Sequence, residues 1–271
     1  MGLFSIARFA AICFFALAFS SSSNASPPQS YLSFDSSNSS YLDVQDDPIL
    51  DLTAGAITLS TWIRPIAWGQ NHQGRIIDHG GGNNPAVGYS FHVENPGGSG
   101  STGGLRLQIN NDTSFVGQSN ADVITLGEWQ HVALTLDQGI LNFYVNGVPA
   151  GTSSGVPTPN ASTASIRFGA RASDGARGFH GDIAELQIWS RPLSQLEIQD
   201  FMDSQLAGNE NGLEAYFLLD DGMGEFAADL SSNNFSAQLG NSPGPDSRDP
   251  LWYTPPITNT APIVEAGSDQ H

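Results

Sequence analysis

Two aspartates set among serines and asparagines are the first candidates for chemistry in this sequence. Asp35 lies in SFDSSNSSY (33–41), and Asp229 lies in ADLSSNN (228–234). Such turns are rich in oxygen atoms, which are the ligands that Ca²⁺ takes in proteins. The same composition also suits Asx turns, in which an aspartate side chain caps its own backbone. The sequence therefore leaves two interpretations open at each position, a structural Ca²⁺ ligand or a simple turn.

A tryptophan between turn residues is the candidate for sugar binding. Trp68 lies in IAWGQNHQG (66–74), close to Asn71 and His72. An indole offers an apolar face for stacking, and the two neighbours offer hydrogen-bonding groups. We therefore predict a ligand site at a loop rim formed by these three residues, bordered by glycine-rich loops at 79–85 and 95–104. The alternative is an indole that folds back onto the body of the protein.

Other catalytic or metal-binding arrangements find little support in the sequence. His131 has no Gly-x-Ser-x-Gly element to accompany it, so a serine hydrolase is not indicated. The six histidines form no pair at the spacing of zinc ligands, and Cys13 is the single cysteine. On these grounds the sequence does not predict a zinc site.

The charge balance is strongly acidic. The chain has 27 acidic residues, 9 arginines and no lysine, and its net charge is −18. A surface of this charge repels nucleic acid, which we exclude as a partner. The acidity fits either a well-solvated secreted surface or the binding of Ca²⁺, which is plentiful outside cells.

The first 25 residues have the features of a secretory signal peptide. Arg8 precedes the apolar run FAAICFFALAF (9–19), and small residues follow up to Ala25. The run is shorter than the roughly 17 residues that a membrane span needs. We expect cleavage after Ala25 and a secreted or cell-surface protein that does not span the membrane. The mature chain would then contain no cysteine and would depend on its core for stability.

Alternation of apolar and polar residues dominates the rest of the chain and predicts an antiparallel β-sandwich. In the hairpin of 127–151, Val132, Leu134 and Leu136 should face the core, opposite Leu141, Phe143 and Val145. A tight turn with positive φ at both central residues is expected at Asn146-Gly147. One short helix is predicted to begin at Ser194, where Ser194 and Glu197 can form a capping box.

Several segments in a fixed order resemble LamG-like jelly-roll domains of the concanavalin A-like lectin/glucanase superfamily. They are TLSTWIRP (58–65), GEWQHVALTLD with LNFYVNGVPAG (127–151), IRFGAR (166–171), FHGDIAELQIWSRPLSQLEI (179–198) and an Asp-Gly-rich segment at 208–234. The resemblance implies a two-sheet jelly-roll sandwich without implying a ligand. It also makes Asp182, which opens the Gly-Asp-Ile strand, a third candidate Ca²⁺ ligand.

The domain organisation follows from these assignments. We predict a signal peptide at 1–25, a LamG-like domain at 30–253, and a Pro/Thr-rich linker at 254–271. NTAPIVEAGSDQ (259–270) resembles the opening of a PKD-type or Ig-like repeat. The chain is therefore expected to be the N-terminal piece of a longer exported protein.

Glycoside hydrolysis is the enzymatic activity that the resemblance suggests, because the superfamily includes glucanases. Retaining glycosidases need two carboxyl groups roughly 5–5.5 Å apart. The resemblance points to His180-Gly-Asp182-Ile-Ala-Glu185, where histidine occupies the position of a first carboxylate. We therefore predict a non-catalytic recognition or adhesion module that binds an extracellular glycan or a surface or matrix protein. The alternatives are a structural spacer and, with less support, a hydrolase.

Overall fold

The computed structural model describes residues 26–80, 87–95, 97, 100, 102–110 and 116–255. The predicted signal peptide, most of the predicted linker and repeat, and parts of both glycine-rich loops lie outside the described residues. Within the described ranges, no helix is both long and apolar enough to cross a membrane.

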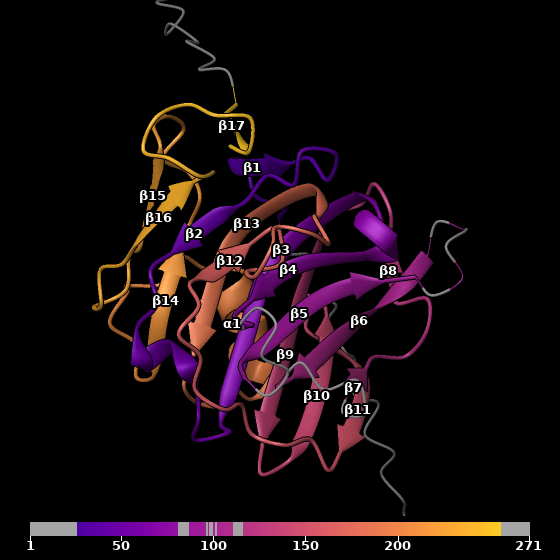
Figure 1. The fold of residues 1–271 in the computed structure, drawn as a ribbon. Helices are drawn as coiled ribbons and strands as arrows, with labels where there is room; N and C mark the ends of the chain where they lie inside the picture. The colour runs from indigo at the N-terminus through magenta and orange to yellow at the C-terminus, as the bar shows by residue number, and fades with distance from the viewer. Residues whose placement is uncertain are drawn as a thin grey trace, which may run out of the picture.

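The described chain forms two antiparallel sheets that lie face to face (Figure 1). Sheet A has the order β11-β10-β9-β3-β13-β1-β17, with β14 paired to β13. Its strands are β1 (Tyr31–Phe34), β3 (Ile57–Ala67), β9 (Gln130–Asp137), β10 (Ile140–Val145), β11 (Val148–Ser154), β13 (His180–Trp189), β14 (Leu213–Phe217) and β17 (Leu251–Tyr253).

Sheet B has the order β15-β16-β2-β12-β4-β5-β6-β7, with β8 paired to β6. Its strands are β2 (Leu42–Val44), β4 (Gln73–Asp78), β5 (Tyr89–Glu94), β6 (Thr102–Ile109), β7 (Val116–Gln118), β8 (Ile124–Thr125), β12 (Ile166–Phe168), β15 (Phe226–Ala228) and β16 (Ser236–Leu239). The helical segments are the 3₁₀ turns η1 (Pro48–Asp51) and η2 (Gln70–His72) and the helix α1 (Gln195–Met202). The predicted two-sheet sandwich with one short α-helix is confirmed.

Two apolar layers hold this architecture together. The larger lies between the sheets and contains inward-facing residues from both, including Leu59, Phe91 and Leu107. The smaller lies on the outer face of sheet A, where Trp189 and Tyr216 pack with residues of and around α1. Since α1 covers part of the outer face of sheet A, this sheet is buried on both sides in that region.

The hairpin of β9 and β10 has the predicted register. Val132 lies opposite Val145, Leu134 opposite Phe143, and Leu136 opposite Leu141. All six side chains contribute to the layer between the sheets, with Val145 only partly buried. Asn146 and Gly147 have φ values of 50° and 69°, so the predicted turn with two positive φ angles is confirmed.

Helix α1 begins as its sequence predicts. The Ser194 hydroxyl accepts a hydrogen bond from the backbone N–H of Glu197 at 3.2 Å. In return, the Glu197 carboxylate accepts one from the backbone N–H of Ser194 at 2.8 Å. This capping box satisfies two N–H groups and fixes the start of the helix over sheet A.

Removing a core side chain from the hairpin should destabilise the fold strongly. Leu134 is fully buried, so Leu134→Ala should lower the free energy of unfolding by about 2–5 kcal/mol, the usual range for an emptied core site. Ile140→Ala, on the same hairpin but 44% exposed, should cost less than about 1 kcal/mol. Urea denaturation of both variants measures the difference, and similar costs would contradict the register.

Candidate binding face and acidic hollow

The predicted loop-rim site does not form around Trp68. Its side chain is only 5% exposed, and its indole Nε1–H donates a hydrogen bond to the Gly100 carbonyl at 3.0 Å. A buried ring cannot stack on a sugar, so the prediction for Trp68 is wrong and the alternative, an indole folded back onto the body, is correct. Asn71 and His72 are exposed in η2 with φ values of 54° and 61°. They lie just before β4 and border the outer face of sheet B.

The Asp229 carboxylate is fully hydrogen-bonded to other groups of the protein. Its two carboxylate oxygens accept four hydrogen bonds, from the backbone N–H groups of Tyr216, Ser231 and Phe235 and from the Ser231 hydroxyl, at 2.7–2.9 Å. A carboxylate has about four acceptor positions, and all are used here. The residue therefore fits the turn interpretation and does not fit a Ca²⁺ ligand.

The other two predicted Ca²⁺ ligands are also engaged in protein contacts. Asp35 accepts a hydrogen bond from the Ser37 backbone N–H at 2.8 Å, which lowers the pKa of its carboxyl group. Asp182 accepts one from Arg64 Nε at 2.7 Å, in an ion pair across β13 and β3. Among the described residues, the one group of three ligand-type side chains that converge is Asp46, Asp51 and His79. The three predicted aspartates therefore do not assemble into a Ca²⁺ site.

The outer face of sheet B carries a row of polar residues that the sequence analysis missed. Strand register places Arg75 opposite His92, His92 opposite Arg106, and Arg106 opposite Gln118, across four neighbouring strands. These residues alternate with core residues such as Leu105 and Leu107, so they point away from the core. The alternation was visible in the sequence, but the pairing partners of the strands were not.

The loop between β12 and β13 adds Arg171 and Arg177 to this row. The Arg75 backbone N–H donates a hydrogen bond to the Arg177 carbonyl at 2.9 Å, and the Gln70 backbone N–H donates one to the Gly178 carbonyl at 3.0 Å. The loop thus continues the pairing of β4 beyond β12. Within the loop, the Arg171 backbone N–H donates to the Ala176 carbonyl at 2.8 Å, which closes a turn.

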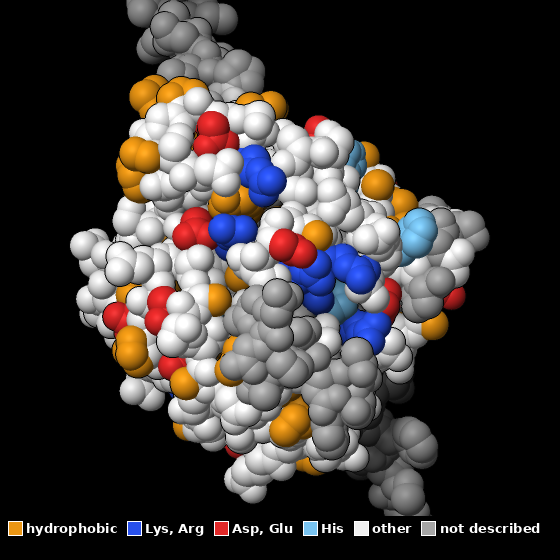
Figure 2. Space-filling view, in the orientation of Figure 1, with side chains coloured by type: hydrophobic (Ala, Val, Ile, Leu, Met, Phe, Trp, Pro, Cys, Tyr) orange, Lys and Arg blue, Asp and Glu red, His pale blue; other side chains and the backbone are white. Residues whose placement is uncertain are grey.

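We call the resulting surface the arginine face. It is defined by five of the nine arginines of the chain: Arg75, Arg106, Arg167, Arg171 and Arg177. Figure 2 shows the basic side chains gathered on this side of the molecule, over β4 and its neighbours. A basic cluster of this kind is unexpected on a chain whose net charge is −18.

The arginine face carries more positive charge than its carboxylates balance. Four of the five arginines have a carboxylate partner: Arg75 pairs with Asp78 at 3.2 Å, Arg106 with Glu94 at 2.5 Å, Arg167 with Asp43 at 2.7 Å, and Arg171 with Asp174. The Arg177 guanidinium makes no hydrogen bond or ion pair to another described residue, so it is the one charge of the face without a carboxylate partner there. Burial and then the positive charge of Arg171 lower the pKa of the Arg177 guanidinium. A bound anion would relieve this repulsion.

The remaining polar groups of the face support the same electrostatic picture. Burial, followed by the charges of Arg75 and Arg106, holds the pKa of His92 well below its ordinary value, so the ring is neutral. Its Nδ1 lies within hydrogen-bonding distance of the Arg75 guanidinium. The Nε atom of Arg106 is buried and makes no hydrogen bond, whereas Nε of Arg75 lies 3.2 Å from Asp78 Oδ2 in a buried ion pair. The face therefore retains one buried donor, Nε of Arg106, that no described residue satisfies.

A hollow of about 190 Å³ with a mixed polar and apolar lining lies beside Glu94, the partner of Arg106. Glu94 and Gln118, the neighbours of Arg106 on the outer face, form one side of it. Hydroxyl, carboxylate and backbone groups of Ser119, Asn120 and Asp122 form the other. Such a lining can exchange hydrogen bonds with the hydroxyl groups of a sugar ring.

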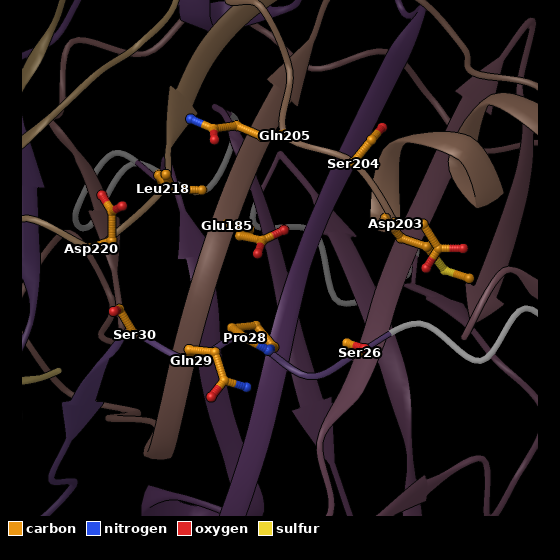
Figure 3. Close-up of a pocket in the computed structure, with 11 residues that line it drawn as sticks. Ser26, Pro28, Gln29, Ser30, Glu185, Asp203, Ser204, Gln205, Leu218 and Asp220 are labelled. Carbon is orange, nitrogen blue, oxygen red and sulfur yellow. The ribbon is translucent and has the colours of Figure 1, made fainter. Parts of the chain in front are cut away.

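A second, larger hollow lies beside the end of α1 and measures about 440 Å³. In Figure 3, Glu185 stands at its centre, with Asp220 on one side and Asp203 on the other. The segment that begins at Ser26 runs along its lower edge. The hollow is strongly acidic, and no arginine lines it among the described residues.

A β-bulge aims Glu185 into this hollow. The pairing of β13 with β3 shifts register between Ala184 and Gln187, and Glu185 has a φ of 51°. Bulges re-aim side chains, and a positive φ is costly for a residue with a Cβ. Burial, reinforced by the negative charge of Asp220, raises the pKa of the Glu185 carboxyl group to about 7.

Comparison with known proteins identifies the fold family. A laminin-G-type family model, described as the concanavalin A-like lectin/glucanases superfamily, matches residues 35–199. Among curated proteins, the adhesion G-protein coupled receptor V1 of Danio rerio is 25% identical over 163 residues. That match covers 59% of this chain and 2% of the receptor.

Two solved structures superpose on parts of this chain. A proposed carbohydrate-binding protein from Bacteroides ovatus superposes with a TM-score of 0.61 at 18% identity, covering 83% of this chain and 62% of that one. The CBM40 of the Ruminococcus gnavus IT-sialidase superposes with a TM-score of 0.46 at 14% identity, covering 56% and 85%. At this level of identity the Bacteroides match supports the jelly-roll fold and no particular ligand.

Glu185 should make the stability of the protein depend on pH. Its pKa is raised on folding, so its contribution to stability is fully present below about pH 4.5 and is lost as the pH rises through about 7. Relative to Glu185→Gln, the wild type should therefore lose roughly 1–3 kcal/mol between pH 4.5 and 8. Denaturation of both proteins across this range measures the gap, and Glu128→Gln, at an exposed carboxyl, is the control. If the difference in free energy of unfolding between the wild type and Glu185→Gln does not change with pH, the Glu185 carboxyl group is solvated.

Proposed function

This chain belongs to the concanavalin A-like lectin/glucanase superfamily, and on that premise we propose that it is a non-catalytic recognition module that binds an acidic glycan on its arginine face. The observation that carries the proposal is the concentration of five of the nine arginines on one sheet face of a chain with a net charge of −18. Carboxylate and sulfate groups are the natural ligands of clustered guanidinium groups.

The exposure of these guanidinium groups favours the binding of an anion from solvent over a purely structural role in ion pairs within the protein. Arg106, Arg171 and Arg177 are half-buried, so their guanidinium groups retain access to solvent. The Arg177 guanidinium forms no ion pair with a described carboxylate, and burial, followed by the charge of Arg171, disfavours its positive charge. An acidic sugar bound at this point would supply the missing counter-charge.

The adjoining hollow provides the second half of the proposed site. An acid group held by Arg106 and Arg177 would leave the sugar ring over the hollow between Gln118 and Asp122. The hydroxyl groups of the ring would then meet the polar atoms of Ser119 and Asn120. Asn71 and His72, at the start of β4, border the same face and are available for contacts with neighbouring sugar units.

The proposed setting is extracellular. A signal peptide at 1–25, a module at 30–253 and a linker at 254–271 that opens a PKD-type or Ig-like repeat would make this the N-terminal module of a longer exported protein. Its partner would be an acidic glycan of the cell surface or matrix, free or carried by a matrix protein. The alternative is a spacer that binds no glycan. Ca²⁺ is not part of the proposed site, because Asp35, Asp182 and Asp229 do not converge.

Loss of Arg177 should weaken glycan binding. A charge-assisted hydrogen bond contributes about 1.5–3 kcal/mol, so Arg177→Ala should raise the Kd for an acidic oligosaccharide by about tenfold or more. The wild-type protein is first screened on an array of carboxylated, sulfated and neutral glycans, and the Kd of the best acidic ligand is then measured by titration calorimetry. Binding should also weaken with added salt, because exposed charges are screened.

The control for this experiment is Arg191→Ala. Arg191 pairs with Glu197 of α1 at 2.7 Å, on the side of the molecule opposite the arginine face. Its removal should leave the Kd unchanged. An equal loss in both variants would show a non-specific charge effect, and no binding to any glycan by the wild type would favour the spacer.

Hydrolysis of β-glucans should not occur. His180 stands where a carboxylate would be needed, and Asp182 is engaged by Arg64 at 2.7 Å. The measurement is the release of reducing sugar from laminarin and related polymers by the purified protein. Activity that disappears in Asp182→Asn or Glu185→Gln would establish a glycosidase and overturn the non-catalytic assignment.

A further inference from the structure

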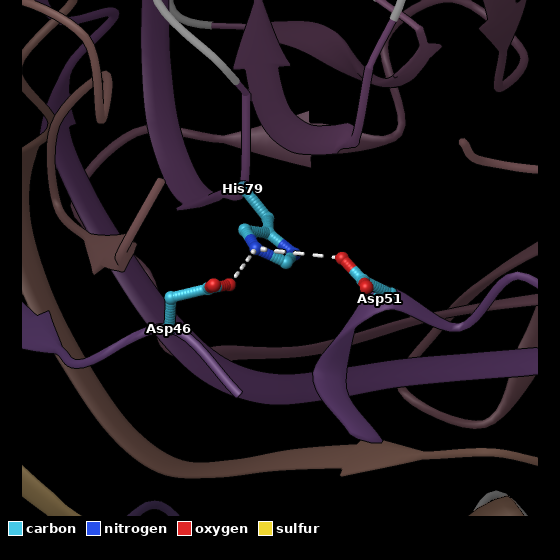
Figure 4. A group of neighbouring side chains, drawn as sticks. All are labelled: Asp46, Asp51 and His79. Atoms are coloured by element: carbon cyan, nitrogen blue, oxygen red, sulfur yellow. Dashed lines mark hydrogen bonds and ion pairs between the residues drawn. The ribbon is translucent and has the colours of Figure 1, made fainter. Parts of the chain in front are cut away.

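A buried histidine and two aspartates converge at the end of β4, outside the proposed glycan site. His79 follows β4, Asp46 precedes η1, and Asp51 ends η1 (Figure 4). One ligand-type atom from each lies within 4.8 Å of the others. Asp46 and Asp51 lie close to the two ends of η1 in the sequence, and they meet the more distant His79 because η1 packs near the end of β4.

The distances within this cluster do not fit ordinary hydrogen bonds. His79 Nε2 lies 3.4 Å from Asp46 Oδ1 and 4.0 Å from Asp51 Oδ1. A good N–H···O hydrogen bond is about 2.9–3.0 Å long. Ligands bound to zinc at about 2.0–2.2 Å in a tetrahedral arrangement are instead separated by roughly 3.4 Å. The cluster is therefore spaced like a ligand set that is slightly open.

The histidine itself is held in place without a strong partner. Its side chain is completely buried, its edge packs against Tyr89 at 5.5 Å, and its backbone N–H donates to the Tyr89 carbonyl at 2.8 Å. Its Nδ1 makes no hydrogen bond, while Nε2 lies nearer to the Asp46 carboxylate than to that of Asp51. A fully buried imidazole that lacks a hydrogen bond of normal length is unusual, because buried polar groups are normally satisfied.

The two aspartates differ in their surroundings, because Asp51 is held by a hydrogen bond and Asp46 is partly exposed. The Asp51 carboxylate is oriented by the Ser162 backbone N–H at 2.8 Å. The Asp46 side chain is 30% exposed, which leaves an approach from solvent to the cluster. Two carboxylates beside an imidazole offer the oxygen and nitrogen atoms that a transition-metal dication takes as ligands.

We propose that Asp46, Asp51 and His79 form a binding site for a transition-metal dication, Zn²⁺, with water completing the coordination. An imidazole nitrogen beside two carboxylate oxygens suits Zn²⁺, whereas Ca²⁺ takes oxygen ligands at longer distances. The metal would tie η1 to the end of β4 and so stabilise the edge of sheet B. The site does not depend on the glycan-binding function.

Metal binding to the untagged full chain tests this proposal directly. After treatment with EDTA and dialysis, the protein should bind one Zn²⁺ per chain, measured by equilibrium dialysis with elemental analysis. Zn²⁺ should also raise the melting temperature, and Ca²⁺ at the same concentration should not. Asp46→Asn should weaken Zn²⁺ binding by at least about tenfold, because a neutral amide is a poorer ligand for a dication.

The variants separate this site from adventitious binding. Asp46 is partly exposed, so Asp46→Asn should melt like the wild type in EDTA, and His79→Gln provides a second test of the ligand set. His72→Asn removes an exposed histidine outside the cluster and should leave binding unchanged. Absence of Zn²⁺ binding, or equal binding by wild type and Asp46→Asn, would overturn the proposal. Binding lost only in His72→Asn would do the same.

Discussion

The apolar layer between the two sheets is the constraint on which the rest of this structure depends. Each strand can bury only every second side chain in that layer, so the residues between must face outward. In β6, Leu105 and Leu107 enter the layer, and Arg106 and Gln108 therefore point away from it. The side chains of sheet B that form the arginine face alternate along the strands with the core side chains that stabilise the protein.

Pairing across sheet B turns this local alternation into a surface. Antiparallel register aligns Arg75, His92 and Arg106 on adjacent strands, where their side chains are close enough to interact. The β12–β13 loop then takes the place of a strand beside β4, because the Arg75 backbone N–H bonds to the Arg177 carbonyl. Five guanidinium groups gather there against four paired carboxylates, and the unpaired charge of Arg177 is the main physical reason to regard the face as a ligand site.

The other features of interest lie where regular pairing is interrupted. The bulge in β13 turns Glu185 into the acidic hollow, and burial there raises its pKa to about 7. At the end of β4, regular pairing stops and His79 meets Asp46 and Asp51 from η1. Both places bring together ionisable groups that a continuous ladder would have kept apart. The acidic hollow and the cluster at His79 are thus consequences of departures from the sandwich pattern.

The sequence by itself determined the sandwich architecture, the register of the hairpin at 130–145 and the capping box at Ser194. These depend on alternation, turn residues and short-range hydrogen bonds, all of which act between near neighbours in the chain. The sequence did not determine that Trp68 is buried, because a loop position says nothing about which way the indole folds. It also could not show that hydrogen bonds from Tyr216, Ser231 and Phe235 saturate Asp229. The arginine face and the cluster of Asp46, Asp51 and His79 were decided only by tertiary structure, because strand order and loop packing bring together residues that are distant in the chain.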